Sequence, residues 1–179
     1  MNSIKSKLAV GLFSLMLAAS VALAGTPGEE QKKTLDKVRK ELVTLPYYGV
    51  FDNLEYKIEG DTVTLSGQVL RPTTRQDAER RVTKTVGVGH VINNIEVLPL
   101  SGFDDSIRAR EYRAVFGTGS LYRYAMGVNP SVHILVKNGN VTLEGVVSNQ
   151  ADSHLANIAA RGVPGVFSVT NNLRIVRGS

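Results

Sequence analysis

The chain has 179 residues, of which 42% are hydrophobic and 21% charged, a composition typical of a globular protein and not of a disordered one. Its formal net charge is +5, and it contains no Cys, which excludes disulfides, thiolate metal sites and a thiol nucleophile. The length suffices for one ordinary domain or two small ones.

The first 24 residues have the pattern of a secretory signal peptide. Lys5 and Lys7 precede an apolar run over 8–21, and Ala22-Leu23-Ala24 provides the small residues of a cleavage site. The apolar run is shorter than the about 20 residues of a membrane-spanning helix, so we expect cleavage after Ala24 and not a retained anchor. Loss of the two lysines takes the net charge from +5 to +3. We therefore expect a periplasmic protein without a transmembrane helix, with an anionic envelope component and not nucleic acid as its partner.

The next part of the chain begins with a short flexible stretch, 25–28, and then becomes periodic. Apolar residues spaced three and four apart predict the first helix. Gly60-Asp61 suits the two-residue type II′ turn of a hairpin, which places Tyr56 opposite Leu65. In chain order, the predicted elements are a helix over 29–44, a hairpin over 56–69, a helix over 75–85 and a strand over 91–98. Residues 29–98 therefore have the order αββαβ.

The same order follows a short linker at 99–103. Asn138-Gly139 is a strong signal for a type I′ hairpin turn. The last helix is expected to turn Leu155, Ile158 and Ala159 inward. In chain order, the predicted elements are a helix over 104–116, a less regular segment over 117–130, a hairpin over 132–147, a helix over 151–161 and a strand over 166–176. Residues 104–177 thus form a second αββαβ unit.

A sequence repeat supports this division. One offset of 78 residues aligns Val63-Thr64-Leu65-x-Gly67-x-Val69 with its copy at 141–147, and Gly87-Val88-x-x-Val91-x-Asn93-Asn94 with its copy at 165–172. Matches at so many positions are not expected by chance. The repeat is longer than the 20–50 residues of solenoid repeats, so it indicates two domains.

Two pairs of glycines recur at this offset. Gly67 and Gly145 lie within strands on the inward face, where we expect a close backbone approach at which a helix crosses the sheet. Gly87 and Gly165 are expected at helix ends, where a left-handed backbone is needed.

At these residues the chain resembles the BON-domain family. Its hallmarks are a hairpin with V-x-L-x-G-x-V, then a helix, then G-V-x-x-V-x-N-x-L/I, and both copies contain them. The resemblance implies an α+β fold of two tandem αββαβ domains, each with a three-stranded mixed sheet and two helices packed on one face. It also implies an exported, non-catalytic protein associated with phospholipid or the envelope. Some relatives are lipoproteins, but this chain has no Cys to carry a lipid.

The residues indicate no catalytic, cofactor or metal site. The three histidines, His90, His133 and His154, are not at metal-ligand spacing. The glycine pairs at 87–89 and 117–119 lack the third glycine and the strand–helix context of a phosphate loop. We therefore expect no enzyme activity and no cofactor.

One basic and aromatic cluster stands out at the start of the second unit. Guanidinium groups suit phosphate, and phenols suit the headgroup level of a membrane. Its members are Arg108, Arg110, Arg113, Tyr122, Arg123 and Tyr124. The alternative is a solvated helix face with core tyrosines. A second basic group, Arg75, Arg80, Arg81 and Lys84, is more typical of a solvated helix face.

The outer faces of the two predicted sheets differ. The hairpin register places His133, Leu135 and Val146 on the outer face of the second sheet, where the first sheet has polar residues. Apolar residues on an outer face predict a contact with the first domain or with a partner.

The sequence therefore favours a non-enzymatic periplasmic envelope protein that binds anionic phospholipid or another envelope component, in a role connected with envelope or osmotic stress. The alternative is a structural or protein-interaction module without direct lipid binding. An envelope hydrolase is a third class, and no nucleophile or carboxylate pair in the sequence supports it.

Overall fold

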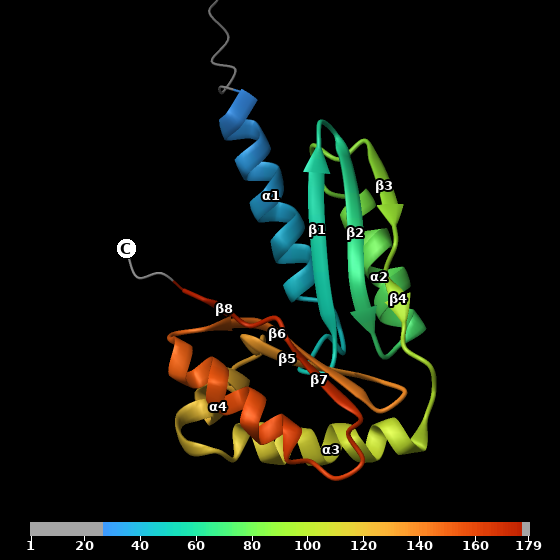
Figure 1. The fold of residues 1–179 in the computed structure, drawn as a ribbon. Helices are drawn as coiled ribbons and strands as arrows, with labels where there is room; N and C mark the ends of the chain where they lie inside the picture. Colours follow the sequence, from blue (N-terminus) through green and yellow to red (C-terminus); the bar gives the residue numbers. More distant parts are fainter. Residues whose placement is uncertain (1–26, 177–179) are drawn as a thin grey trace, which may run out of the picture.

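The computed structural model describes residues 27–176, so the predicted signal peptide lies outside the described residues. The chain forms two α+β units in tandem, each with its own sheet and its own apolar core. Figure 1 shows the first unit standing on one face of the second sheet, with the helices α3 and α4 on the far side of that sheet.

The first unit comprises α1 (Pro27–Val43), β1 (Asn53–Glu59), β2 (Thr62–Val69), α2 (Pro72–Thr83), β3 (His90–Asn93) and β4 (Glu96–Val97). β1 and β2 are antiparallel in the predicted register, with Tyr56 opposite Leu65. β3 and β4 both run parallel to β2 and together occupy the place of the third strand. The predicted strand over 91–98 is broken because the side-chain oxygen of Asn93 accepts a hydrogen bond from the amide of Ile95, at 3.1 Å.

The core of the first unit lies between the sheet and its two helices. Val38 and Leu42 of α1, Ala78 and Val82 of α2, and alternate residues of β2 are all buried. Each such aliphatic side chain contributes roughly 1.5–3 kcal/mol when it leaves water. The polar helix α1 is stabilised mainly by this contact, because helices in proteins owe most of their stability to the packing of an apolar face.

The second unit comprises α3 (Gly102–Phe116), a 3₁₀ helix η1 (Gly119–Ala125), β5 (Val132–Lys137), β6 (Asn140–Val147), α4 (Gln150–Arg161), β7 (Ser168–Asn171) and β8 (Arg174–Ile175). α3 begins inside the predicted linker, because the hydroxyl of Ser101 caps it by accepting from the amide of Asp104. Asn138 and Gly139 have φ of 51° and 73°, which confirms the predicted type I′ turn.

Of the predicted inward face of α4, Leu155 and Ala159 do pack against the core, whereas the prediction for Ile158 is wrong. Ser153, Ala156 and Ala160 are buried, whereas the side chain of Ile158 is 67% exposed. The small residues let α4 lie close to the sheet and to α3, so the larger Ile158 is turned to the flank. Apolar periodicity alone favoured the larger side chains.

The glycines within strands have a different cause from the predicted one. Gly67 and Gly145 have φ of 107° and 116°, and a Cβ at either would overlap the backbone carbonyl of Asn53 or Ser131 in the neighbouring segment of the hairpin. The close approach is therefore within the hairpin, and the predicted helix crossing is wrong. Gly87 and Gly165 have the predicted positive φ, 98° and 90°, but they lie beyond the helix ends, in the turns before β3 and β7.

Candidate interaction surfaces

The outer face of β5 lies against the first unit. His133 is buried, its Nδ1 is 3.1 Å from the carbonyl oxygen of Gly49, and its ring centroid is 5.6 Å from that of Tyr48. Leu135 is 5% exposed, and Lys137 forms a 2.5 Å ion pair with Glu96 of β4. Burial lowers the pKa of His133, although hydrogen bonds with backbone groups such as that of Gly49 oppose the shift.

The connector at 47–52, between α1 and β1, makes this contact possible. The buried carboxylate of Asp52 accepts hydrogen bonds from the amides of Gly49, at 3.0 Å, and Leu70, at 2.7 Å. Burial raises the pKa of Asp52, and these two amides oppose the rise. These hydrogen bonds hold the connector in place, and the carbonyl of Val50 within it accepts a hydrogen bond from the amide of Ile134, at 2.8 Å. The outer edge of β5 is thereby covered by the first unit.

Three residues were predicted for the outer sheet face. His133 contacts the first unit, Leu135 is covered at the boundary between the units, and Val146 is half-buried. A role of this face toward another protein stays a prediction.

The predicted basic and aromatic cluster does not form one surface. Arg108 is 4% exposed and donates to Asp105, at 2.6 Å, and to the carbonyl of Val136, at 2.6 Å. It lies beside Asp104, whose buried carboxylate accepts from the amides of Asn138 and Gly139. Asp104 and Arg108 thus hold the start of α3 against the hairpin, and the guanidinium of Arg108 already has hydrogen-bond partners within the fold.

Tyr124 is also buried, at the contact between η1 and α4. Its hydroxyl donates to Asp152 at 2.5 Å and accepts from the amide of Ser148 at 2.9 Å. Arg123 pairs with the same carboxylate at 2.5 Å. The hydrogen bond from Tyr124 is the main cause of the lowered pKa of Asp152, and the charge of Arg123 adds to it.

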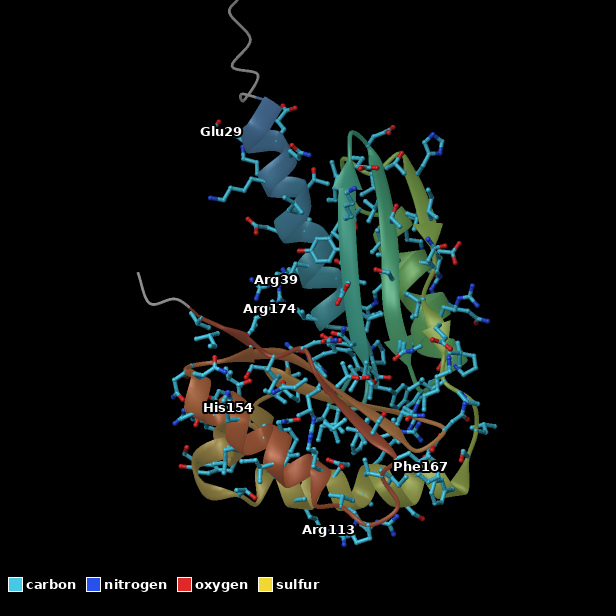
Figure 2. All side chains as sticks on the ribbon, viewed as in Figure 1. Glu29, Arg39, Arg113, His154, Phe167 and Arg174 are labelled. Carbon is cyan, nitrogen blue, oxygen red and sulfur yellow. The ribbon has the colours of Figure 1, made fainter. Side chains whose placement is uncertain are left out.

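Four members of the cluster remain toward solvent: Arg113, Tyr122 and Arg123, which are exposed, and Arg110, which is half-buried. Tyr122 is 59% exposed and lies with Arg113 at a cavity of about 610 Å³ between α3 and η1. We call the side chains that line this cavity the aromatic-basic patch: Tyr112, Arg113, Phe116, Tyr122 and Met126. Figure 2 shows Arg113 on the side of α3 that faces away from the first unit.

Sequence reasoning missed two exposed apolar residues near this patch. Met126, 64% exposed, follows η1, and Ile158 lines a shallower groove of about 500 Å³ together with Arg110 and Arg113. η1 is a 3₁₀ helix, so no α-helical spacing in its sequence marks Met126, which follows it, as exposed. Nothing in the sequence of α4 marks Ile158 as exposed.

One buried group in α3 is unusual. Glu111 is fully buried, and neither carboxylate oxygen has a hydrogen-bond partner among the described residues. Desolvation raises its pKa to about 8, so the side chain is largely protonated at neutral pH. No group of three or more His, Asp or Glu side chains within residues 27–176 is arranged to hold a metal ion.

Each of the two α+β units has a hairpin and a broken third strand. Among the described residues, no helix is long and apolar enough to cross a bilayer. The chain belongs to the BON-domain family: the family described as "BON domain" matches residues 33–99 and 124–177. The first match covers most of the first unit, and the second begins at Tyr124, so α3 lies outside it. No curated protein matches the chain.

Solved structures give a loose likeness only. One is CdsD, a structural protein of the type III secretion system of Chlamydia trachomatis, with 10% identity, 82% of this chain and 94% of that chain covered, and a TM-score of 0.34. Another is the C-terminal domain of CdsD, with 12% identity, 80% of this chain and 97% of that chain covered, and a TM-score of 0.28. No partner or function follows from likenesses at this level.

Proposed function

We propose that the protein is a non-enzymatic component of the periplasm that binds anionic phospholipid surfaces through the aromatic-basic patch. The observation that carries the proposal is the exposure of Tyr122 and Met126 beside Arg113, over a cavity between α3 and η1. Membership of the BON-domain family supports an envelope role without catalysis.

The chemistry of the patch suits the headgroup level of a membrane. A guanidinium such as that of Arg113 can hold a phosphate by two parallel hydrogen bonds. Tyr112 and Tyr122 have the amphipathic rings that gather at this level, and Met126 offers an apolar side chain for the layer below. The net charge of +3 after loss of the signal peptide favours approach to an anionic surface.

Co-sedimentation of the chain from residue 25 with vesicles tests the proposal. Vesicles rich in phosphatidylglycerol should bind it, those of phosphatidylcholine should not, and salt should weaken the binding. Arg113→Ala combined with Tyr122→Ala should lower the bound fraction about tenfold, because both the phosphate and the interfacial contact are lost. Arg75→Ala with Tyr47→Ala is the matched control, since both residues are exposed on the first unit.

Absence of binding to anionic vesicles at low salt would overturn the proposal and favour the alternative, a structural or protein-interaction module of the envelope. Equal loss of binding in the control pair would show that net charge, and not the patch, is responsible.

A further inference from the structure

The outer edge of β1 carries unpaired backbone groups. The carbonyl of Leu65 in β2 accepts from the amide of Asn94 at 2.8 Å, so the backbone polar groups of Leu65 point away from β1. Tyr56 lies directly opposite Leu65, and in an antiparallel pair of this kind both residues direct their N–H and C=O outward. Ile58, two residues along, points the same way. Within residues 27–176, β1 pairs with β2 alone.

The equivalent edge in the second unit shows that this geometry accepts a partner. Ile134 stands at the position of Tyr56 in the repeat, and its outward amide donates to Val50. The carbonyl of Val136, also outward, accepts from Arg108. β5 is thus covered, whereas Figure 1 shows β1 at the margin of the first sheet. A bare edge of this kind is a template for another strand.

We propose that two copies of the chain pair through their β1 edges, antiparallel and centred on Tyr56, so that the two first-unit sheets become one. Tyr56 then lies opposite the partner's Tyr56, and Leu54 opposite the partner's Ile58. Each Tyr56 exchanges both of its outward hydrogen bonds with its symmetry mate. The proposal does not depend on lipid binding, because the aromatic-basic patch belongs to the other unit.

The charges of β1 select this register. Glu55, Lys57 and Glu59 alternate on the exposed face of the strand. Centring on Tyr56 places Glu55 opposite the partner's Lys57, and the two-fold axis repeats that favourable pair. Centring on Lys57 would keep the same backbone groups outward, but it would oppose Lys57 to itself and Glu55 to the partner's Glu59. That alternative is disfavoured, because like charges directly opposite each other repel.

The surroundings of the edge leave room for the partner strand. A groove of about 590 Å³ runs beside Asn53 and Tyr56, and Glu144 and Arg174 of the second unit close its far side. In the proposed register the partner's Glu59 lies opposite Asn53, at this groove, where Arg174 offers a positive charge. The amide of Leu54 is already reached by the phenol oxygen of Tyr48, so the new ladder relies on Tyr56, the amide of Ile58 and the carbonyl of Leu54.

Sedimentation equilibrium of the chain from residue 25, at low ionic strength, tests the proposal. The parent should show a monomer–dimer equilibrium. Lys57→Glu should weaken it by about tenfold or more, because both symmetry-related pairs become repulsive, and Glu55→Lys should do the same. The double variant Glu55→Lys/Lys57→Glu should restore the parent dissociation constant to within about threefold.

Lys84→Glu is the matched control, since it makes the same change of net charge at the exposed residue that follows α2 and should leave the dimer unchanged. Hydrogen exchange gives an independent measure: the amides of Tyr56 and Ile58 should exchange more slowly as protein concentration rises. A parent that stays monomeric at millimolar concentration overturns the proposal, and so does a dimer in which the two single variants and the double variant behave alike.

Discussion

The two units share a fold but differ in what lies outside their cores. The first unit has a polar outer face and a bare strand at its edge, whereas the second has a buried outer face and a strand edge covered by the connector of the first. The repeat preserves core residues at an offset of 78, but Lys57 of the first copy corresponds to Leu135 of the second. Tandem copies thus keep the pattern that forms the core and diverge on the outer faces of their sheets, exposed in the first unit and covered in the second.

The largest expected effect concerns a feature that the units share. Gly67→Ala and Gly145→Ala should each cost about 4 kcal/mol, because each combines a positive φ with overlap against a backbone carbonyl. Urea unfolding followed by far-ultraviolet circular dichroism measures this cost. If one variant proves neutral, the two hairpins are not equivalent and the comparison fails.

The next effect should separate the units. Leu135→Lys copies the first unit's residue into the second and should cost about 3 kcal/mol, because it buries an unpaired ammonium. The reverse exchange, Lys57→Leu, is at an exposed site and should change stability by less than about 0.5 kcal/mol. Both values come from denaturant unfolding at low protein concentration. Equal costs would mean that the outer face of β5 is not a packed boundary.

The stability of the second unit should depend on pH through a buried carboxyl group. The pKa of Glu111 is raised to about 8 in the folded chain, so the folded state holds its proton while the unfolded state releases it above about pH 4.5. Stability contributed by this group therefore falls as pH rises, by roughly 2 kcal/mol between about pH 5.5 and about pH 7. Glu111→Gln should flatten this dependence and be the more stable protein at the upper pH. An unchanged pH profile would place the titration elsewhere. At the same helical position the first unit has the exposed Lys33, so Lys33→Gln is the control.

The smallest effect concerns the added 3₁₀ helix of the second unit. Tyr124→Phe removes the hydroxyl that joins Asp152 to the amide of Ser148 and should cost about 1 kcal/mol. Tyr122→Phe, at an exposed neighbour, is the control and should be neutral. Thermal unfolding compares the two. A neutral Tyr124→Phe would show that η1 is held by apolar packing alone.

The parts of the fold that depend on local pattern could be predicted from the sequence. Turn residues and period-two alternation set both hairpin registers, and the repeated motif marked two units. Features that depend on contacts between distant segments could not. The burial of Arg108 requires knowing that α3 crosses the edge of β5, and the exposure of Ile158 requires knowing how closely α4 approaches its neighbours.

The candidate surface was predicted only in outline for the same reason. Arginine and tyrosine were found in the right segment, but composition does not distinguish Arg113, which is exposed, from Arg108, which bonds the sheet edge. Which side chains of α3 are exposed depends on where the hairpin tip lies against this helix. Asp104 of α3 accepts a hydrogen bond from the amide of Asn138 at that tip, 34 residues further along the chain.

The hydrogen bond from Ile134 to Val50 makes the order of the two units along the chain meaningful. The connector of the leading unit acts as a cover for the unit that follows it, so the units are not interchangeable modules. Removal of the first unit would leave Leu135 and the edge of β5 without that cover, and self-association of the isolated second unit would be the consequence. The second unit thus depends on the first for the cover of its outer strand.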